Sequence, residues 1–215
     1  MAHLKKYIPL TFFLILVISG CRKGPQQADI IYSNDFENND LKGFTGGQIS
    51  AYNNSMVLGR YNKGGFELKL SQLPKHDLVE ISFDLFIHDS WDGNLTDVGG
   101  PDIWKMEIEG SDFIRTTFNN NDCVSCLPQS YPFNYLNSNQ NPRTGAYQTD
   151  LPGACLWADK SRGTSLYKIV KTVSHNTATF SMKCIDELFQ SNTVNQVCDE
   201  SWSVDNLVIK TIKLD

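Results

Sequence analysis

The sequence predicts an all-β protein folded as an antiparallel sandwich. Apolar and polar residues alternate over 66–70 and again over 79–87, which is the period of a half-buried strand. No convincing amphipathic helix is visible. Further strands are expected at 103–109, 113–118, 166–173, 178–185 and 202–212, because clusters of Asn, Gly, Asp and Pro separate these segments. Several short strands with regular turn signals are typical of two packed antiparallel sheets.

The longest alternation indicates which face of its strand is buried. One face of 79–87 carries only apolar residues, namely Val79, Ile81, Phe83, Leu85 and Ile87. The other face is polar except for Phe86, so the apolar face is expected to pack in the core. The segment 173–178 predicts a hairpin turn between the strands on either side of it. Residues 186–197 have room for one short helical turn.

Composition and charge exclude several classes of protein. The chain has 215 residues, of which 40% are hydrophobic, 11% aromatic and 20% charged. These values are ordinary for a globular domain and exclude a disordered chain, a collagen-like repeat or a coiled coil. The formal net charge is −5, whereas a nucleic-acid-binding protein is expected to be basic. We therefore expect no nucleic-acid partner and favour neutral ligands or cations such as calcium.

The first twenty residues predict a targeting segment. Lys5 and Lys6 precede an almost wholly apolar run over 7–18. This run is shorter than the roughly 20 residues that cross a bilayer, and it fits the apolar region of a secretory signal peptide over 1–20.

The end of this segment resembles a bacterial lipobox. In Ile18-Ser19-Gly20-Cys21, small residues precede a cysteine, and the resemblance implies that Cys21 is lipidated and becomes the new N-terminus. Such an anchor holds firmly because each buried CH₂ contributes about 0.8 kcal/mol. Arg22 in place of Asp is unlike an inner-membrane retention signal. We therefore expect a lipid anchor in the outer membrane, on its periplasmic or its cell-surface face.

The remaining chain is expected to form one domain. Residues 21–29 are predicted to form a polar, lipidated tether, and residues 30–215 are predicted to form the sandwich domain. Within it, 119–162 is long, polar and rich in Pro, Gly and aromatic residues. A compact domain seldom carries so long a loop without a function, so we expect this loop insertion to cap one end of the sandwich.

Five cysteines remain in an oxidising compartment if Cys21 is lipidated. Cys184 and Cys198 flank a loop and are the expected disulfide. The other three, Cys123, Cys126 and Cys155, allow one further disulfide and leave one thiol. A zinc site would need a second Cys-x-x-Cys pair, and a redox pair would need a helix N-terminus, so a structural disulfide is favoured.

Three motifs point to a family. They are Asp35-Phe36-Glu37, the stretch from Phe83-Asp84 through Asp89-Ser90-Trp91-Asp92-Gly93-Asn94 to Gly100-Pro101-Asp102, and Asp199-Glu200-Ser201-Trp202-Ser203-Val204-Asp205-Asn206. Together they resemble jelly-roll modules of secreted bacterial proteins, in the broad carbohydrate-binding-module, galactose-binding and concanavalin-like group of sandwiches. The resemblance covers residues 30–213. It implies a jelly-roll fold, and its motifs have little specificity for a ligand.

The resemblance also implies a structural calcium ion that joins an acidic residue of the first strand to an Asp of the last. Glu37 and Asp205 would fill these places. Ca²⁺ takes about 6–8 oxygen ligands, and carboxylates from distant parts of a chain suit it. The alternative is that Glu37 caps a turn and that Asp205 accepts backbone N–H bonds.

A Gly-rich stretch offers a second candidate cation site, with oxygen ligands at i, i+3 and i+5. Its members are Asp89, Asp92, Asn94, Asp97 and Asp102. The ligand order of an EF-hand is missing. The alternative is a turn that Asp and Asn side chains stabilise.

Aromatic residues in the loop insertion predict a ligand surface, because sugar-binding modules present flat aromatic faces flanked by polar side chains. The candidate ligand-binding residues are Tyr131, Tyr135, Tyr147, Trp157 and Arg143. The alternative is that these aromatic residues only hold the loop in place. In contrast, Trp91, Trp104 and Trp202 are expected to pack in the core.

Catalysis is not expected. None of the four His residues lies in a nucleophile or zinc motif. Glu107 and Glu109 on one side of a strand allow a jelly-roll glycoside hydrolase as the enzymatic alternative, but the Glu-x-Asp-x-x-Glu pattern of laminarinase-type glucanases is missing. We expect a lipid-anchored, calcium-stabilised, non-catalytic binding module for a glycan or glycoprotein. The alternative is a structural or adhesion subunit of an outer-membrane complex, in which 119–162 contacts a surface protein.

Overall fold

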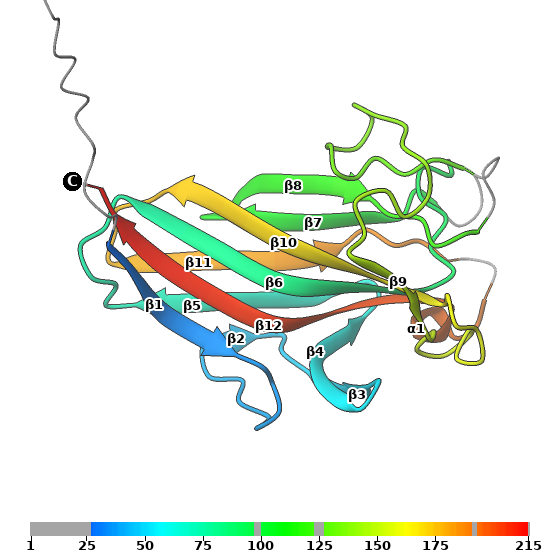
Figure 1. Ribbon diagram of the computed structural model, residues 1–215, viewed down its shortest axis with the longest axis horizontal. Coiled ribbons are helices and arrows are strands. Elements are labelled where there is room, and N and C mark those ends of the chain that lie inside the picture. Colours follow the sequence, from blue (N-terminus) through cyan, green and yellow to red (C-terminus); the bar gives the residue numbers. More distant parts are fainter. Residues whose placement is uncertain (1–26, 97–99, 123–126, 191–192, 215) are drawn as a thin grey trace, which may run out of the picture.

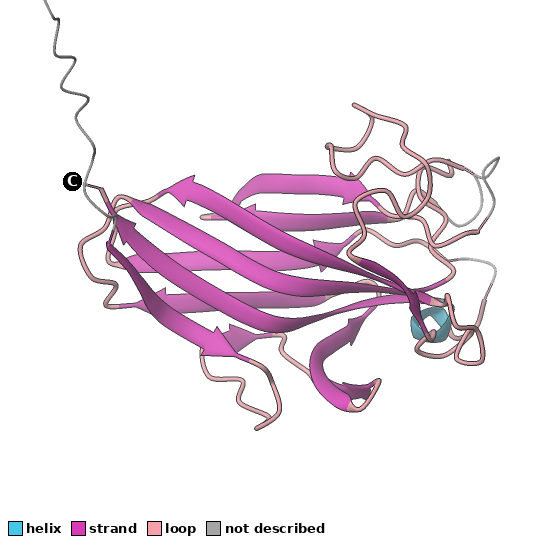
Figure 2. Cartoon of the chain, in the orientation of Figure 1, coloured by secondary structure: helices cyan, strands magenta, loops and turns pink. Residues whose placement is uncertain are grey.

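The computed structural model describes residues 27–96, 100–122, 127–190 and 193–214. Within them the chain forms two antiparallel sheets that pack face to face as a jelly-roll sandwich, as Figure 1 and Figure 2 show. The predicted all-β fold class is therefore confirmed. The one helix among these residues is α1 (Gln196–Asp199). No helix in the described ranges is long and apolar enough to cross a membrane.

The larger sheet, called sheet A, has seven strands. The order along it is β3, β4, β12, β6, β10 and β9, and β1 pairs with the C-terminal half of β12. The strands are β1 (Gln27–Asn34), β3 (Ile49–Tyr52), β4 (Ser55–Tyr61), β6 (Leu78–Asp89), β9 (Gln148–Leu151), β10 (Thr164–Ser174) and β12 (Glu200–Lys213).

The smaller sheet, called sheet B, has five strands in the order β2, β5, β11, β7 and β8. The strands are β2 (Phe44–Thr45), β5 (Gly65–Ser71), β7 (Ile103–Ile108), β8 (Ser111–Thr117) and β11 (Thr179–Asp186). All seven strands expected from the sequence are present with shifted ends, whereas β1 to β4 and β9 are additional. Of these, β2, β3 and β9 are short and lie at sheet edges, and β1 and β4 carry a weaker alternation of apolar and polar residues.

The core lies between the two sheets. The apolar face of β6 is buried along its whole length, as its alternation predicts. Trp91, Trp104 and Trp202 are fully buried, which confirms their expected packing role. The Trp202 indole Nε1 donates to Asp186 Oδ2 over 2.8 Å, and that of Trp91 donates to the Ser201 carbonyl over 2.9 Å. Two of the three buried indole N–H groups thus have a partner.

The predicted hairpin at 173–178 is wrong. β10 belongs to sheet A and β11 to sheet B, so this segment crosses from one sheet to the other. It lies beside the crossing between β5 and β6, since the His175 N–H donates to the Asp77 carbonyl over 3.1 Å and the Leu73 N–H to the Ala178 carbonyl over 3.0 Å. A turn signal indicates where a strand ends, but not with which sheet the next strand pairs.

The loop insertion 119–162 lies at one end of the sandwich (Figure 1). It contains the strand β9 and an antiparallel bridge between Gln129 and Gln140. At the N-terminal boundary of the domain, β1 begins at Gln27. Strand pairing therefore includes residues of the stretch 21–29 that was expected to be a tether. The signal segment, the lipidation residue Cys21, and Cys123 and Cys126 lie outside the described residues.

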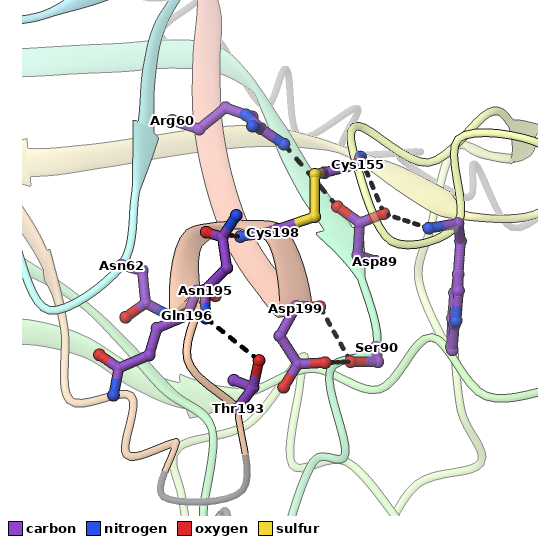
Figure 3. The surroundings of a disulfide bond; sticks show 11 residues. Arg60, Asn62, Asp89, Ser90, Cys155, Thr193, Asn195, Gln196, Cys198 and Asp199 are labelled. Carbon is purple, nitrogen blue, oxygen red and sulfur yellow. Dashed lines mark hydrogen bonds and ion pairs between the residues drawn. A yellow bond between two sulfur atoms is a disulfide. The ribbon is translucent and has the colours of Figure 1, made fainter.

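The predicted disulfide between Cys184 and Cys198 is wrong. Cys198 is bonded to Cys155 with a Cα–Cα distance of 4.9 Å (Figure 3), and Cys184 is a buried free thiol. Cys184 alternates on β11 with Met182 and Asp186, which are both buried, so it points into the core. Cys198 lies on α1, away from that face. The disulfide fastens the loop insertion to α1.

Loss of this disulfide should reduce stability by about 4 kcal/mol, as the chain-entropy relation gives for a closed loop of 43 residues. We expect Cys155→Ala and Cys198→Ala to lower the denaturation midpoint equally, and the double variant to lower it no further. Urea unfolding of the parent protein, the two single variants and the double variant measures this. Additive losses for Cys155→Ala and Cys198→Ala would contradict the pairing.

Candidate functional site

The outer face of sheet A carries a connected set of side chains, called the polar row: Tyr147, Lys168, Asp84 and Asn206. Lys168 Nζ lies 4.7 Å from the centroid of the Tyr147 ring and 3.2 Å from Asp84 Oδ1. Asn206 Nδ2 donates to Asp84 Oδ2 over 3.0 Å. The row therefore runs from the residue before β9 across β10 and β6 to β12.

Strand register places these side chains together. Lys168 on β10 is directly opposite Asp84 on β6, and their sequence neighbours Ile169 and Leu85 are buried. Since successive side chains alternate between faces, Asp84 and Lys168 point away from the core. The register of β12 shifts after Asp205, and Asn206 has a φ of 53°. This irregularity brings the Asn206 amide to the Asp84 carboxylate.

The polar row borders a shallow hollow. Its volume is about 280 Å³, and Ser82, Asp84, Lys168, Val170 and Asn206 contribute to its lining. The Tyr147 side chain is 68% exposed and the Val170 side chain is 58% exposed. The face thus offers an aromatic ring and an apolar side chain beside an ammonium, a carboxylate and an amide. Such a surface can pack against C–H groups and hydrogen-bond hydroxyl groups of one ligand.

Only one of the five predicted ligand residues, Tyr147, belongs to the polar row. Tyr131 instead packs in the core, with ring centroids 5.0 Å from Phe118 and 5.1 Å from Tyr167. Burial raises the pKa of Tyr131. Its ring is engaged by the core and is not displayed to a ligand.

Tyr135 and Trp157 lie elsewhere. The Tyr135 N–H donates to the Arg115 carbonyl over 2.6 Å on β8 of sheet B, and the Arg115 guanidinium lies 5.4 Å from the Tyr135 ring. Trp157 follows the disulfide-bonded Cys155, and Lys160 Nζ lies 4.2 Å from its ring. Both residues are half-buried, whereas Tyr147 is exposed.

Arg143 is buried and holds the loop insertion together. Its guanidinium donates to the Arg162 carbonyl over 2.7 Å, to the Thr149 carbonyl over 3.1 Å and to the Asn120 carbonyl. It also lies 3.3 Å from an Asp122 oxygen. These contacts give Arg143 a structural role in the loop insertion.

Sequence reasoning missed three members of the row, Asp84, Lys168 and Asn206. The alternation of β6 and β10 contains a signal for the first two, since both are polar residues between buried apolar ones. The sequence carries no comparable signal for Asn206, because its position depends on the irregularity in β12.

The first candidate calcium pair lies beside this face. Glu37 Oε1 accepts hydrogen bonds from Ser55 Oγ over 2.5 Å and from the Met56 N–H over 2.9 Å. These two bonds lower the pKa of Glu37. The carboxylate of Glu37 is thereby held near the start of β4.

Asp205 is close enough for the charge of Glu37 to affect its pKa. It is 6% exposed, and its Oδ1 accepts from the Asn206 N–H over 2.6 Å. Burial, and then the charges of Asp84, Glu37 and Asp35, raise the pKa of Asp205 from 3.8 to about 6. The pair therefore sits in an excess of negative charge, although no group of three or more His, Cys, Asp or Glu in the described ranges is arranged to hold a metal.

The structure divides the second candidate cation site. Asp89 Oδ1 accepts from the Cys155 N–H over 3.2 Å and the Trp157 N–H over 2.9 Å. Asp102 Oδ2 instead accepts from the backbone N–H groups of Asp92 and Gly93. Asp89 and Asp102 thus each stabilise a different loop, and Asp97 lies outside the described residues.

Asp102 has a further partner that the sequence did not suggest. Asp102 and Glu200 are both buried, and their carboxyl groups interact. Burial, and then the charge of Asp102, raise the pKa of Glu200 to about 11. The pair therefore retains a proton at neutral pH.

The two carboxylates of the enzymatic alternative have separate partners. Glu107 lies 3.3 Å from Lys105 Nζ and 3.8 Å from Lys183 Nζ. Glu109 lies beyond the end of β7, and its Oε1 is 3.4 Å from His175 Nε2. Glu107 and Glu109 are therefore not arranged as a catalytic pair of carboxylates in one substrate cleft.

Comparisons with known proteins find similarity to solved structures only, at low sequence identity. No family model and no curated protein matches the chain. Among solved structures, it is similar to dimeric latent PorU from Porphyromonas gingivalis, at 6% identity and a TM-score of 0.48, over 91% of this chain and 14% of PorU. The chain thus spans about one seventh of that protein.

Two smaller structures are matched over nearly their whole length. A family 35 carbohydrate-binding module from Clostridium thermocellum is 9% identical with a TM-score of 0.37, covering 85% of this chain and 97% of that one. The CBM22-2 xylan-binding domain from Paenibacillus barcinonensis Xyn10C is 14% identical with a TM-score of 0.38, covering 84% and 98%. These likenesses concern the sandwich architecture, and they carry no argument about a ligand.

Proposed function

We propose that this protein is a non-catalytic binding module for a neutral glycan, which it holds on the outer face of sheet A. The observation that supports this most directly is the exposed Tyr147 ring next to the paired side chains of Lys168, Asp84 and Asn206. A sugar ring has an apolar C–H face and a rim of hydroxyl groups. Tyr147 suits the first, and the three polar side chains suit the second.

Charge pairing within the row favours a neutral ligand. Lys168 and Asp84 neutralise each other at 3.2 Å, so neither needs an ionic partner from outside. Both still have hydrogen-bonding capacity toward solvent, because Lys168 has three donors and Asp84 several acceptor sites. The row also extends across the sheet, because its members lie on the three neighbouring strands β10, β6 and β12. Neighbouring strands are about 4.8 Å apart.

We also propose that the module is held in the outer membrane by acylation of Cys21. The support is the lipobox-like sequence Ile18-Ser19-Gly20-Cys21 after an apolar run. Since β1 begins at Gln27, only a short polar stretch would separate the anchor from the sandwich.

Replacing Tyr147 should weaken glycan binding. We expect Tyr147→Ala to lose about tenfold in affinity, equivalent to about 1.4 kcal/mol, because the ring no longer packs on the sugar. Affinity electrophoresis through gels containing xylan, galactomannan or mixed-linkage glucan measures the retardation. Tyr135→Ala is the matched control, since Tyr135 lies in the loop insertion against Arg115 of β8 and away from the polar row, and this variant should leave retardation unchanged.

Two outcomes would contradict the proposed surface. Retardation lost in Tyr135→Ala and kept in Tyr147→Ala would move the site to the loop insertion. Retardation by none of a broad panel of neutral polysaccharides would favour the alternative of a protein-binding subunit. That alternative has its own support, because Phe133 and Leu136 in the loop insertion are 55% and 79% exposed.

We further propose that Ca²⁺ binds between Glu37 and Asp205. The support is the local excess of carboxylates, because Asp84, Glu37 and Asp35 all raise the pKa of Asp205. An oxygen-ligated cation would relieve this repulsion, and backbone carbonyls could complete its ligands. Glu37 and Asp205 would hold the ion and thereby join the turn after β1 to β12.

Calcium should stabilise the protein more at pH 7 than at pH 5. The raised pKa of Asp205 means that its protonated form stabilises the fold at low pH and that this contribution is lost as the pH rises through about 6. Ca²⁺ should offset the loss at pH 7, where Asp205 is ionised. Thermal unfolding with calcium or with chelator, at both pH values, measures the effect.

Asp205→Asn should abolish both the calcium shift and this part of the pH dependence. Asp159→Asn, at an exposed position of the loop insertion, is the matched control and should leave both unchanged. Equal melting temperatures with calcium and chelator at pH 7 would remove the calcium proposal and leave the glycan proposal standing.

A further inference from the structure

Two histidines meet at the end of the sandwich opposite the loop insertion. His76 lies on the crossing between β5 and β6, and His175 lies on the crossing between β10 and β11, both at that end of the molecule (Figure 1). The two residues are buried, at 3% and 8% exposure. Their rings are stacked with centroids 5.0 Å apart, and His76 Nε2 lies 2.7 Å from His175 Nδ1. This pair belongs neither to the polar row nor to the proposed calcium site.

The outer nitrogen of each ring has a partner that requires a bound hydrogen. His76 Nδ1 lies 2.6 Å from the Pro74 carbonyl oxygen, which can only accept. His175 Nε2 lies 3.2 Å from Thr177 Oγ1. The single hydroxyl hydrogen of Thr177 is donated to the Thr179 carbonyl over 2.8 Å, so Thr177 accepts from His175. Both outer nitrogens therefore carry a hydrogen.

The two inner nitrogens then need a third proton between them. With both outer nitrogens protonated, two neutral imidazoles would bring two lone pairs together at 2.7 Å, which is repulsive. One added proton between His76 Nε2 and His175 Nδ1 turns this contact into a charge-assisted hydrogen bond. The pair in this geometry holds three protons and carries one positive charge. A fourth proton would place two N–H groups against each other and break the bond.

Glu109 supplies the opposite charge. Its Oε1, on the turn between β7 and β8, lies 3.4 Å from His175 Nε2 and accepts from the Ser181 N–H over 2.8 Å. In a neutral pair that donates from His175 Nδ1, the Nε2 lone pair would face this carboxylate, so Glu109 favours the hydrogen on Nε2. β11 contributes the uncharged Phe180 ring, 5.4 Å from the His175 ring.

Asp77 and Lys213 also lie beside the pair, and they neutralise each other. The Asp77 carbonyl accepts the His175 N–H over 3.1 Å, and its carboxylate lies 2.8 Å from Lys213 Nζ at the end of β12. The bond to Lys213 and, more weakly, the charge of His76 lower the pKa of Asp77. Lys75, next to His76 in the sequence, is exposed. Glu109 is therefore the carboxylate left to balance a charged histidine pair.

We propose that His76 and His175 form a pH-sensitive latch between the two sheet crossings, closed by one shared proton. The latch joins the β5–β6 crossing to the β10–β11 crossing and, through Glu109, to the β7–β8 turn. β1 begins at the same end of the sandwich, since Gln27 pairs with Lys213. The latch therefore lies where the chain enters the domain. It is independent of the glycan and calcium proposals, because it shares no residue with either site.

The proton count predicts that the latch contributes most near neutral pH. An ordinary imidazole titrates at about pH 6.5, so in the unfolded chain two histidines carry four ring hydrogens well below this pH and two well above it. The closed latch carries three. Its contribution to stability therefore rises with pH on the acid side, where the unfolded chain binds more protons, and falls on the alkaline side, where it binds fewer. The contribution of Asp205, in contrast, only falls as the pH rises through about 6.

A double-mutant cycle separates the latch from other titrating groups. Urea unfolding of the parent protein, His76→Gln, His175→Gln and the double variant gives the coupling between the two histidines. We expect a coupling of about tenfold in the unfolding constant at pH 6.5, equivalent to about 1.4 kcal/mol. The coupling should be smaller at both pH 4.5 and pH 8.5. A coupling that is absent at pH 6.5, or equal at all three pH values, would overturn the proposal.

Replacing Glu109 should make the latch open at lower pH. In Glu109→Gln, the alkaline loss of coupling should move down by about half a pH unit, the size expected for an ion pair whose carboxylate is 48% exposed. Glu187→Gln is the matched control, because Glu187 is 39% exposed and is paired with Lys105 and Arg115. This variant should leave the alkaline loss in place.

Nuclear magnetic resonance of the parent protein counts the protons without any substitution. Long-range ¹H–¹⁵N spectra of the histidine rings at pH 6.5 should show hydrogens on His76 Nδ1 and His175 Nε2, with one strongly downfield proton between the inner nitrogens. This downfield signal should disappear on raising the pH to 8.5, when the shared proton leaves. A His175 ring without a hydrogen on Nε2 at pH 6.5, or a pair with only two ring hydrogens, would overturn the latch even if the variants failed to fold.

Discussion

The buried carboxylate of Asp186 holds together several segments of the chain that strand pairing does not join directly. It lies at the end of β11 in sheet B and accepts the indole N–H of Trp202 from β12 in sheet A, over 2.8 Å. It also accepts the N–H groups of Lys63, Gly64 and Leu188. One buried side chain thus fixes the two sheets, the β4–β5 turn and the segment before α1 relative to one another. Burial raises the pKa of Asp186, and the four donors compensate for the cost of placing a carboxylate there.

The same end of the sandwich depends on two more buried charges. Arg143 binds backbone carbonyls from separate parts of the loop insertion, and Asp89 binds the backbone N–H groups of Cys155 and Trp157. With the disulfide between Cys155 and Cys198, these contacts give a long loop the fixed position that its composition alone would not provide. The loop is thereby held by its own internal contacts beside the outer face of sheet A, where we propose that a glycan binds.

The sequence predicted the strands whose alternation is strong and missed those whose alternation is weak. β6 was predicted almost to its ends, because its nine central residues place five apolar side chains on one face. The error at 173–178 arose because a turn between two strands has the same composition whether they pair with each other or belong to opposite sheets. The error at Cys184 was avoidable, since the alternation of β11 already puts this residue on the buried face.

The sequence by itself determined the all-β class and the separation of polar from apolar faces, because these follow from the two-residue period of a strand. Only the tertiary structure decided which distant residues meet. The strand order β9, β10, β6 brings Tyr147 to Lys168 and Lys168 to Asp84. Asn206 joins them through a shift in β12, and Cys155 reaches Cys198 across 43 residues. Pairing order and register are properties of the assembled sheets, and a local pattern does not contain them.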